Sequence, residues 1–124
     1  MSARILLVED EEDLRESLKR VLTKEGYIVD GVDSSESALM AIHDRFYDVV
    51  ISDIILPGLT GMDLLKRCTA NNPDLRVIII TAYATIESAV EAVKAGAFDY
   101  MVKPILHDEL KAVVKKALQD KTSS

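Results

Sequence analysis

Short apolar runs alternate with segments of helical periodicity along the whole chain, and this alternation limits the possible folds more than any other feature. Strand-length runs are predicted at about 4–8, 27–32, 48–52, 75–80 and 98–102. The segments that follow them repeat apolar residues every three to four positions, as amphipathic helices do. Strands that alternate with helices favour a parallel sheet covered on both faces. We therefore predict one doubly wound α/β domain for the 124 residues.

Local signals place the helices of this predicted domain. Helices are expected at about 11–25, at about 85–95 and at about 107–119, and two more should follow Asp33 and Thr60. Gly26 and Gly96 are typical helix stops, and Asp33 with Glu36, like Thr60 with Asp63, has capping-box spacing. A polar tail is expected at 120–124. The stripes predicted to face inward include Leu14, Leu18, Val21 and Leu22; Leu39, Ile42 and Phe46; Ile86, Ala89, Val90 and Val93; and Leu110, Val113, Val114, Ala117 and Leu118.

Composition narrows the setting in which this domain works. It is 48% hydrophobic and 29% charged, as soluble proteins are, and no apolar stretch approaches the roughly 18 residues of a membrane span. No signal-peptide core precedes the first strand, so a cytoplasmic location is expected. The net charge of −6 argues against direct binding of nucleic acid. The single cysteine, Cys68, lies in a helical pattern and is predicted to be a core residue.

Polar residues follow four of the predicted strands at the point where each strand ends. Glu9 and Asp10 follow the first, Asp53 the third, Thr81 the fourth and Lys103 the fifth. Strands of a parallel sheet run the same way, so their carboxyl ends share one edge, where ligands of such sheets bind. These side chains are therefore expected to face one crevice.

The chemistry of this crevice follows from its charges. Three carboxylates at close quarters repel one another, and Lys103 alone cannot balance them. Hard oxygen ligands without a nearby histidine or thiolate point to Mg²⁺. Lys103 and the Thr81 hydroxyl would add a positive charge and a donor for a phosphoryl group. Asp53 lies between the two sets, and carboxylates can accept phosphoryl groups covalently, so Asp53 is predicted to form an aspartyl phosphate.

Simpler explanations apply to several neighbouring residues. Acids commonly occupy the first turn of a helix, which accounts for Glu11, Glu12 and Asp13. The Lys103-Pro104 bond could form a fixed turn that aims the lysine into the crevice, but the sequence leaves its cis or trans state open. The two histidines lack metal-ligand spacing and are predicted to be surface residues; they are His43 and His107.

Taken together, these motifs resemble the receiver domains of two-component response regulators over 4–118. Leu7-Val8-Glu9-Asp10 is similar to the acidic pair of that family, and Asp53-Ile54-Ile55-Leu56-Pro57-Gly58 with Gly61 resembles its phosphoacceptor loop. Thr81-Ala82 resembles the switch hydroxyl with its small neighbour, and Lys103-Pro104 the final turn.

The resemblance implies a five-stranded flavodoxin-like sheet of order 2-1-3-4-5 and a set of roles. Asp53 would accept the phosphoryl group, which Thr81, Ala82 and Lys103 would bind. Thr81 and Tyr100 would form the switch pair, and Pro104 would fix the last turn. The implied Mg²⁺ ligands are Asp10, Asp53, the backbone carbonyl of Ile55 and, through water, Glu9.

The resemblance also implies the partners of such a domain. A sensor histidine kinase would donate the phosphoryl group, and the face made by the fourth helix, fifth strand and fifth helix would change. That face would control an output module or a receiver homodimer. The segments 81–85 and 96–100 resemble the nitrogen-regulation subclass, whose ATPase and DNA-binding modules act in sigma-54-dependent transcription. Neither module is present here, so the chain is expected to be an excised receiver or a stand-alone one.

Other functional classes match the sequence less well. A phosphatase of the haloacid dehalogenase type would need a general acid two residues after Asp53, where Ile55 stands. A dinucleotide-binding domain would need glycines where Glu9 and Asp10 follow the first strand. A binding module that has lost phosphate chemistry would not need the complete set of acids, Thr81 and Lys103. The chain is therefore predicted to be a regulatory phosphoacceptor and not an enzyme acting on a separate substrate.

Overall fold

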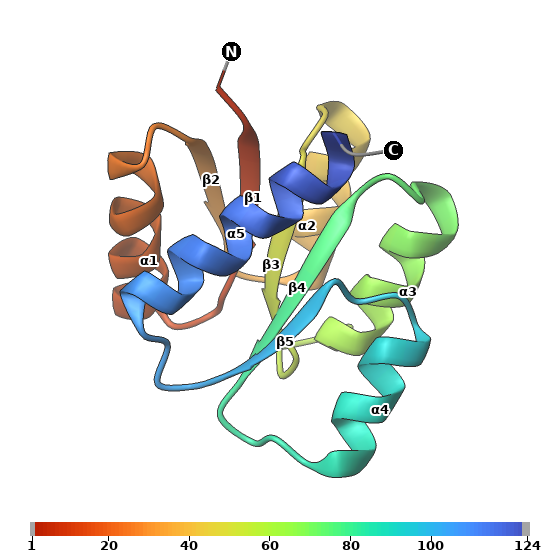
Figure 1. Cartoon of the computed structure of the whole chain (residues 1–124). Coiled ribbons are helices and arrows are strands. Elements are labelled where there is room, and N and C mark those ends of the chain that lie inside the picture. The colour runs from red at the N-terminus through yellow and green to blue at the C-terminus, as the bar shows by residue number, and fades with distance from the viewer. Residues whose placement is uncertain (1, 123–124) are drawn as a thin grey trace.

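The computed structural model describes residues 2–122, and it has the predicted parallel sheet (Figure 1). The strands lie in the order β2-β1-β3-β4-β5, and all neighbours are parallel. The strands are β1 (Arg4–Val8), β2 (Ile28–Val32), β3 (Val49–Asp53), β4 (Arg76–Thr81) and β5 (Asp99–Val102). The helices are α1 (Glu12–Lys24), α2 (Ser35–Asp44), α3 (Gly61–Asn71), α4 (Ile86–Lys94) and α5 (His107–Thr122). The predicted fold class is confirmed.

Two apolar cores hold the sheet between two layers of helices. One core joins α1 and α5 to one face, through side chains such as Leu18, Leu22 and Leu110. The other joins α2, α3 and α4 to the opposite face, through side chains such as Leu64 and Leu65. Figure 1 shows α5 crossing in front of the sheet beside α1. Burying a leucine stabilises a fold by roughly 1.5–3 kcal/mol, so α1, α3 and α5, which bury leucines, are firmly attached.

The central strand β3 carries the chain to the functional edge of the sheet. All five of its residues are buried, and it ends at Asp53. In the sheet register Asp53 pairs with Ile80, and Val8 pairs with Ser52. The residues after β1 and β4 therefore emerge beside the last residue of β3.

The start and end of α2 differ from the prediction. Ser34, and not Asp33, caps the helix, because its hydroxyl accepts a hydrogen bond from the Ser37 amide at 3.1 Å. Glu36 instead accepts one from the Leu59 amide at 3.2 Å. The predicted inward position of Phe46 is also wrong: the helix ends at Asp44, so the ring leaves the helical stripe and is exposed.

The other predicted helix limits hold with small changes. Thr60 caps α3 by accepting from the Asp63 amide at 3.1 Å, as its spacing predicts. Helix α5 continues to Thr122, so the predicted tail is helical at 120–122. An apolar stripe marks only the part of a helix that packs, whereas Gln119 and the polar residues after it can still continue a helix. The remainder of that tail, 123–124, lies outside the described residues.

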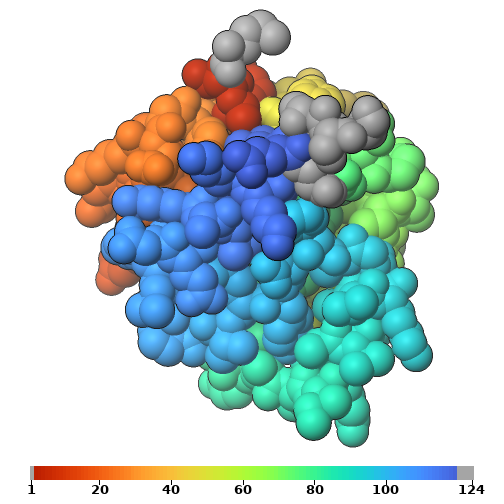
Figure 2. Space-filling model, viewed as in Figure 1, coloured from red at the N-terminus to blue at the C-terminus, as the bar shows by residue number. Residues whose placement is uncertain are grey.

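Helix α4 exposes Ile86, Val90 and Val93 of its predicted inward stripe, contrary to the prediction, whereas Ala89 is half-buried. Ile86 is 84% exposed and Val93 68% exposed, and only Ala92 of this helix is buried. Periodicity reports that a stripe exists but not what covers it. Helix α4 lies beside β5, a four-residue strand at the edge of the sheet. Figure 2 shows it protruding at the lower right of the molecule.

Two further expectations can be compared with the described part of the chain. Cys68 lies on α3 and is buried in the core, as predicted. Within residues 2–122, no helix combines the length and the apolar character that crossing a membrane requires.

Candidate functional site

Three carboxylates meet at the carboxyl edge of the sheet, as the strand ends predict. Glu9, Asp10 and Asp53 each present an oxygen, and the three oxygens lie within 4.8 Å of one another. Glu9 and Asp53 are buried, whereas Asp10 is exposed. This mixture leaves one side of the cluster open to solvent.

The backbone around Asp53 fixes the direction of its carboxylate. The Ile54 amide donates to the Ile80 carbonyl at 3.0 Å, which extends the sheet one residue beyond β3. The Ile55 amide donates to Asp53 Oδ1 at 2.8 Å. Gly61 lies against the other side: a Cβ there would be 2.0 Å from the Asp53 carbonyl oxygen, so only glycine fits. Asp53 is thus held by the loop on both sides.

Lys103 reaches the same cluster from the end of β5. Its amide donates to the Thr81 carbonyl at 2.8 Å, and its bond to Pro104 is cis. The side-chain ammonium donates to Glu9 Oε1 at 2.6 Å and also to Asp53 Oδ2. One lysine therefore bridges two of the three acids, and the cluster keeps an excess of negative charge.

Burial and pairing shift the proton affinities of this bridge. Burial raises the pKa of Glu9, and its hydrogen bond from Lys103 and that from the Glu11 amide only partly oppose this. Burial lowers the pKa of Lys103, but the hydrogen bonds to Asp53 and Glu9 outweigh it, so the net shift is upward. The raised pKa keeps the Lys103 side chain protonated and positively charged. Both oxygens of Glu9 have hydrogen-bond partners, because Oε1 accepts from Lys103 and Oε2 accepts from the Glu11 amide at 3.1 Å.

Thr81 and Tyr100 take separate positions in this structure. Thr81 is buried at the end of β4, and its hydroxyl accepts from the Tyr83 amide at 3.0 Å. Ala82 follows it and is exposed. Tyr100 lies half-buried on β5, and its hydroxyl is 2.6 Å from Ser88 Oγ on α4. Tyr100 therefore connects the fifth strand to the fourth helix.

Two residues that the sequence did not single out support the site. Arg15 on α1 donates to the Glu9 carbonyl at 2.8 Å and so holds the turn that carries the acidic pair. Ser35 on α2 is fully buried and donates to the Thr60 carbonyl at 3.3 Å, which braces the loop after β3. The Ser35 contact joins residues 25 positions apart and the Arg15 contact spans the turn between β1 and α1, and no sequence motif predicts either.

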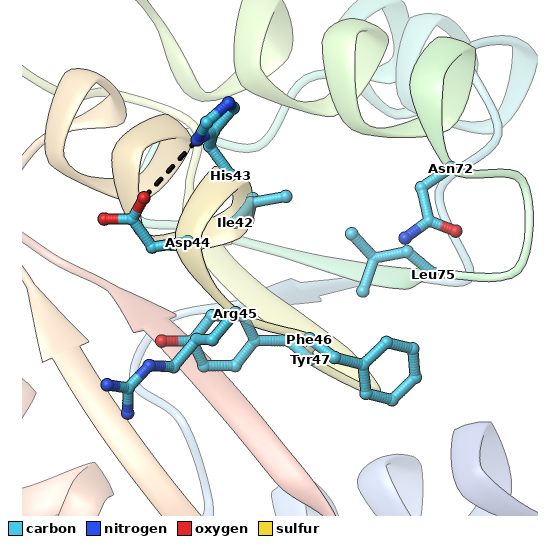
Figure 3. Close-up of a pocket in the computed structure, with 8 residues that line it drawn as sticks. All are labelled: Ile42, His43, Asp44, Arg45, Phe46, Tyr47, Asn72 and Leu75. Carbon is cyan, nitrogen blue, oxygen red and sulfur yellow. Dashed lines mark hydrogen bonds and ion pairs between the residues drawn. The ribbon is translucent and has the colours of Figure 1, made fainter.

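Two hollows on the described part of the surface lie away from the acids. A cavity of about 300 Å³ is at the opposite edge of the sheet, between the end of α2 and the start of β4 (Figure 3). Its lining residues are Ile42, His43, Asp44, Arg45, Phe46, Tyr47, Asn72 and Leu75. A groove of about 640 Å³ runs along the outside of α4. Neither hollow is lined by the acids, whose open side is at the exposed Asp10.

This sheet, with its acidic pair, aspartate and lysine at one edge, defines the class of the protein. Residues 5–115 match the family of response regulator receiver domains, and the chain belongs to that family. Receiver domains are regulatory, and this places the chain among signalling proteins.

Regulators of transcription are among its relatives. It is 40% identical over 116 residues to the regulatory protein AtoC of Escherichia coli K12, covering 94% of this chain and 25% of AtoC. It is 36% identical to the DNA-binding transcriptional regulator NtrC of Proteus hauseri, covering 92% of this chain and 24% of NtrC. The chain thus spans about a quarter of these relatives. The predicted similarity to the nitrogen-regulation subclass is confirmed.

A solved structure supports the same assignment. The beryllofluoride-activated NtrC4 receiver domain dimer superposes with a TM-score of 0.91 at 31% identity. The match covers 95% of this chain and 98% of that one. The fold of an activated receiver is therefore shared over nearly the whole molecule.

Proposed function

We propose that the chain is a phosphorylation switch whose phosphoacceptor is Asp53. The observation that carries the proposal is the position of its carboxylate, between two further acids on one side and Lys103 and Thr81 on the other. A nucleophile needs a partner that stabilises the charge it acquires. Lys103 supplies that charge at the Asp53 oxygen itself.

The proposed reaction transfers a phosphoryl group from a phosphorylated histidine of a sensor kinase. An Asp53 oxygen forms the new bond to phosphorus while the phosphorus–nitrogen bond breaks, and the imidazole keeps the bonding electrons. The aspartyl phosphate carries more negative charge than the aspartate. The Lys103 ammonium can then donate to the phosphoryl oxygens in place of the carboxylate. Thr81 would complete this shell by turning its hydroxyl away from the Tyr83 amide, and Ala82 would leave room beside it. Water would later hydrolyse the aspartyl phosphate slowly, so the domain would catalyse only its own phosphorylation and dephosphorylation.

The donor set fits Mg²⁺. Carboxylate oxygens gather on one open side, and Lys103 leaves their negative charge only partly balanced. Mg²⁺ prefers few protein oxygens and keeps several waters, which suits an open edge. Asp10, Asp53 and the Ile55 carbonyl would hold it, and Glu9 would act through water. A bound Mg²⁺ would neutralise charge on the carboxylates and on the transferred group.

The output face would be formed by α4, β5 and α5. This face exposes apolar side chains, among them Val93, Val102 and Leu106. Phosphorylation shifts a population only if it favours one arrangement of this face over another. We propose that Thr81 and Tyr100 make that connection, and that the face then forms a homodimer or controls an output module. The name of NtrC, a DNA-binding transcriptional regulator, supports transcription as the output. The resemblance of 81–85 and 96–100 to the nitrogen-regulation subclass leads us to propose sigma-54-dependent activation through ATPase and DNA-binding modules in the cytoplasm.

The test is incubation with acetyl phosphate and Mg²⁺ followed by intact mass measurement. The wild type should gain one phosphoryl group, and Asp53→Asn should gain none. Asp74→Asn, which changes an exposed acid before β4, is the matched control and should label like the wild type. Equal labelling of Asp53→Asn and wild type would refute the assignment, and so would an unlabelled wild type.

A further inference from the structure

The first turn of α4 is closed by a reciprocal pair of hydroxyl residues. Thr85 Oγ1 accepts from the Ser88 amide at 3.0 Å. In return, Ser88 Oγ accepts from the Thr85 amide at 3.3 Å and from the Thr85 hydroxyl at 3.0 Å, and it can donate to the Thr85 carbonyl at 3.2 Å. Such capping boxes stabilise helix starts by satisfying amides that have no partner within the helix.

The same Ser88 oxygen contacts Tyr100 on β5. The two hydroxyl oxygens are 2.6 Å apart, a short distance for hydrogen-bonded hydroxyls. Ser88 Oγ thus has three contacts with Thr85 and one with Tyr100. A hydroxyl has one proton and two lone pairs, so it can form three full hydrogen bonds and not four. Whether Ser88 or Tyr100 donates the hydrogen bond between them, that bond takes the proton or a lone pair of Ser88 Oγ and so weakens at least one of its three bonds with Thr85.

We infer that Ser88 is a positioning residue of the switch, in which a single hydroxyl is shared between Tyr100 and the cap of α4. When Tyr100 moves away, Ser88 completes its bonds with Thr85 and the first turn tightens. When Tyr100 is held, that turn is looser. This inference rests on the proposed switch, because it gives Ser88 the role of passing a movement of the Tyr100 ring on to α4.

The other contacts of α4 are few, so a change in the hydrogen bonds of Ser88 can alter the position of its first turn. Only Ala92 of this helix is buried, so apolar packing holds it weakly. At its far end, the Thr69 hydroxyl of α3 donates to the Ala95 carbonyl at 2.9 Å. The Lys66–Glu91 pair at 2.9 Å is exposed on both sides and contributes little. A change at Ser88 therefore acts on the free end of a helix that is held at its other end.

The inference predicts opposite effects for the two partners. In the unphosphorylated protein, Tyr100→Phe should slow exchange of the Thr85 amide about twofold, because Ser88 then serves only the cap. Ser88→Ala should speed that exchange about two- to tenfold, because it removes the acceptor. Ser88→Thr should restore the wild-type rate. Tyr83→Phe, at an exposed tyrosine, is the matched control and should change nothing.

Exchange rates of single amides by NMR test these effects without any phosphorylation. Unchanged or faster Thr85 exchange in Tyr100→Phe would overturn the shared hydroxyl, and so would failure of Ser88→Thr to restore the rate. A second measurement adds acetyl phosphate and Mg²⁺. Ser88→Ala should gain the phosphoryl mass like wild type but lose at least half of the phosphorylation-dependent change in α4 exchange. A full change in Ser88→Ala would also overturn the role of Ser88, whereas an unlabelled wild type would refute only the proposed function.

Discussion

Helices α1 and α4 have the same sequence pattern and opposite surroundings. Each carries an apolar stripe of helical period, but α1 buries Leu18 and Leu22 in the core, whereas α4 exposes Ile86 and Val93. Helix α1 packs against the sheet and beside α5, and α4 lies beside the edge strand. The difference shows that a stripe marks a surface that needs contact. For α1 the fold supplies the contact, and for α4 a partner would have to supply it.

Truncating one residue in each helix should give the largest difference. Leu22→Ala should lower the free energy of unfolding by about 2–5 kcal/mol, because it opens a cavity in the core. Val93→Ala should change it by no more than about 0.5 kcal/mol, because its side chain is already in solvent. Urea unfolding followed by circular dichroism measures both. Equal losses would mean that α4 also packs through its stripe.

Ionisation of Cys68 reports whether the core between α3 and the sheet excludes water. Burial raises its pKa from 9.0 to about 11, which is above the value in the unfolded chain. Its contribution to stability is therefore complete below pH 9 and is lost as the pH rises from 9 to 11, by about 2 kcal/mol. The control is Cys68→Ala, because Tyr47, with a pKa of about 12, titrates in both proteins.

The free energy of unfolding, measured by urea titration between pH 8 and pH 11, should fall more steeply in the wild type than in Cys68→Ala. Parallel curves would contradict a closed core at this position.

A charge on α4 should separate folding from association. Val93→Lys should leave urea unfolding almost unchanged, since the side chain is 68% exposed. If the proposed dimer uses this face, the variant should weaken phosphorylation-dependent association at least tenfold, about 1.4 kcal/mol, because a charge would be buried. Analytical ultracentrifugation with acetyl phosphate measures this. The matched control, Arg20→Glu at an exposed residue of α1, should associate like wild type.

Polar contacts should give the smallest difference between the helices. Arg15→Met removes the bond that ties α1 to the Glu9 carbonyl and should cost about 1 kcal/mol, because that bond is partly buried. Lys66→Met removes the exposed pair with Glu91 on α4 and should cost less than about 0.5 kcal/mol. Urea unfolding of the two variants gives the comparison, and a larger loss for Lys66→Met would reverse it.

The sequence predicted the acid cluster well for a physical reason. Parallel register brings the strand ends to one edge, so Asp53 and Lys103 could be placed together although fifty residues separate them. The outward face of α4 could not be predicted, because periodicity does not say where a sheet ends. Contacts of single side chains across the fold, such as those of Arg15 and Ser88, depend on distances that only the folded chain defines.

Gly61 makes the two sides of Asp53 differ in how tightly they are held. With no side chain between them, the first residue of α3 and the backbone of Asp53 are in direct contact, so the two must move together. A new group can displace one side of a site only if the opposite side stays in place. If Asp53 is phosphorylated as proposed, the close contact with Gly61 would hold the α3 side of Asp53 in place, and Thr81 and the loosely attached α4 would be the parts left to move.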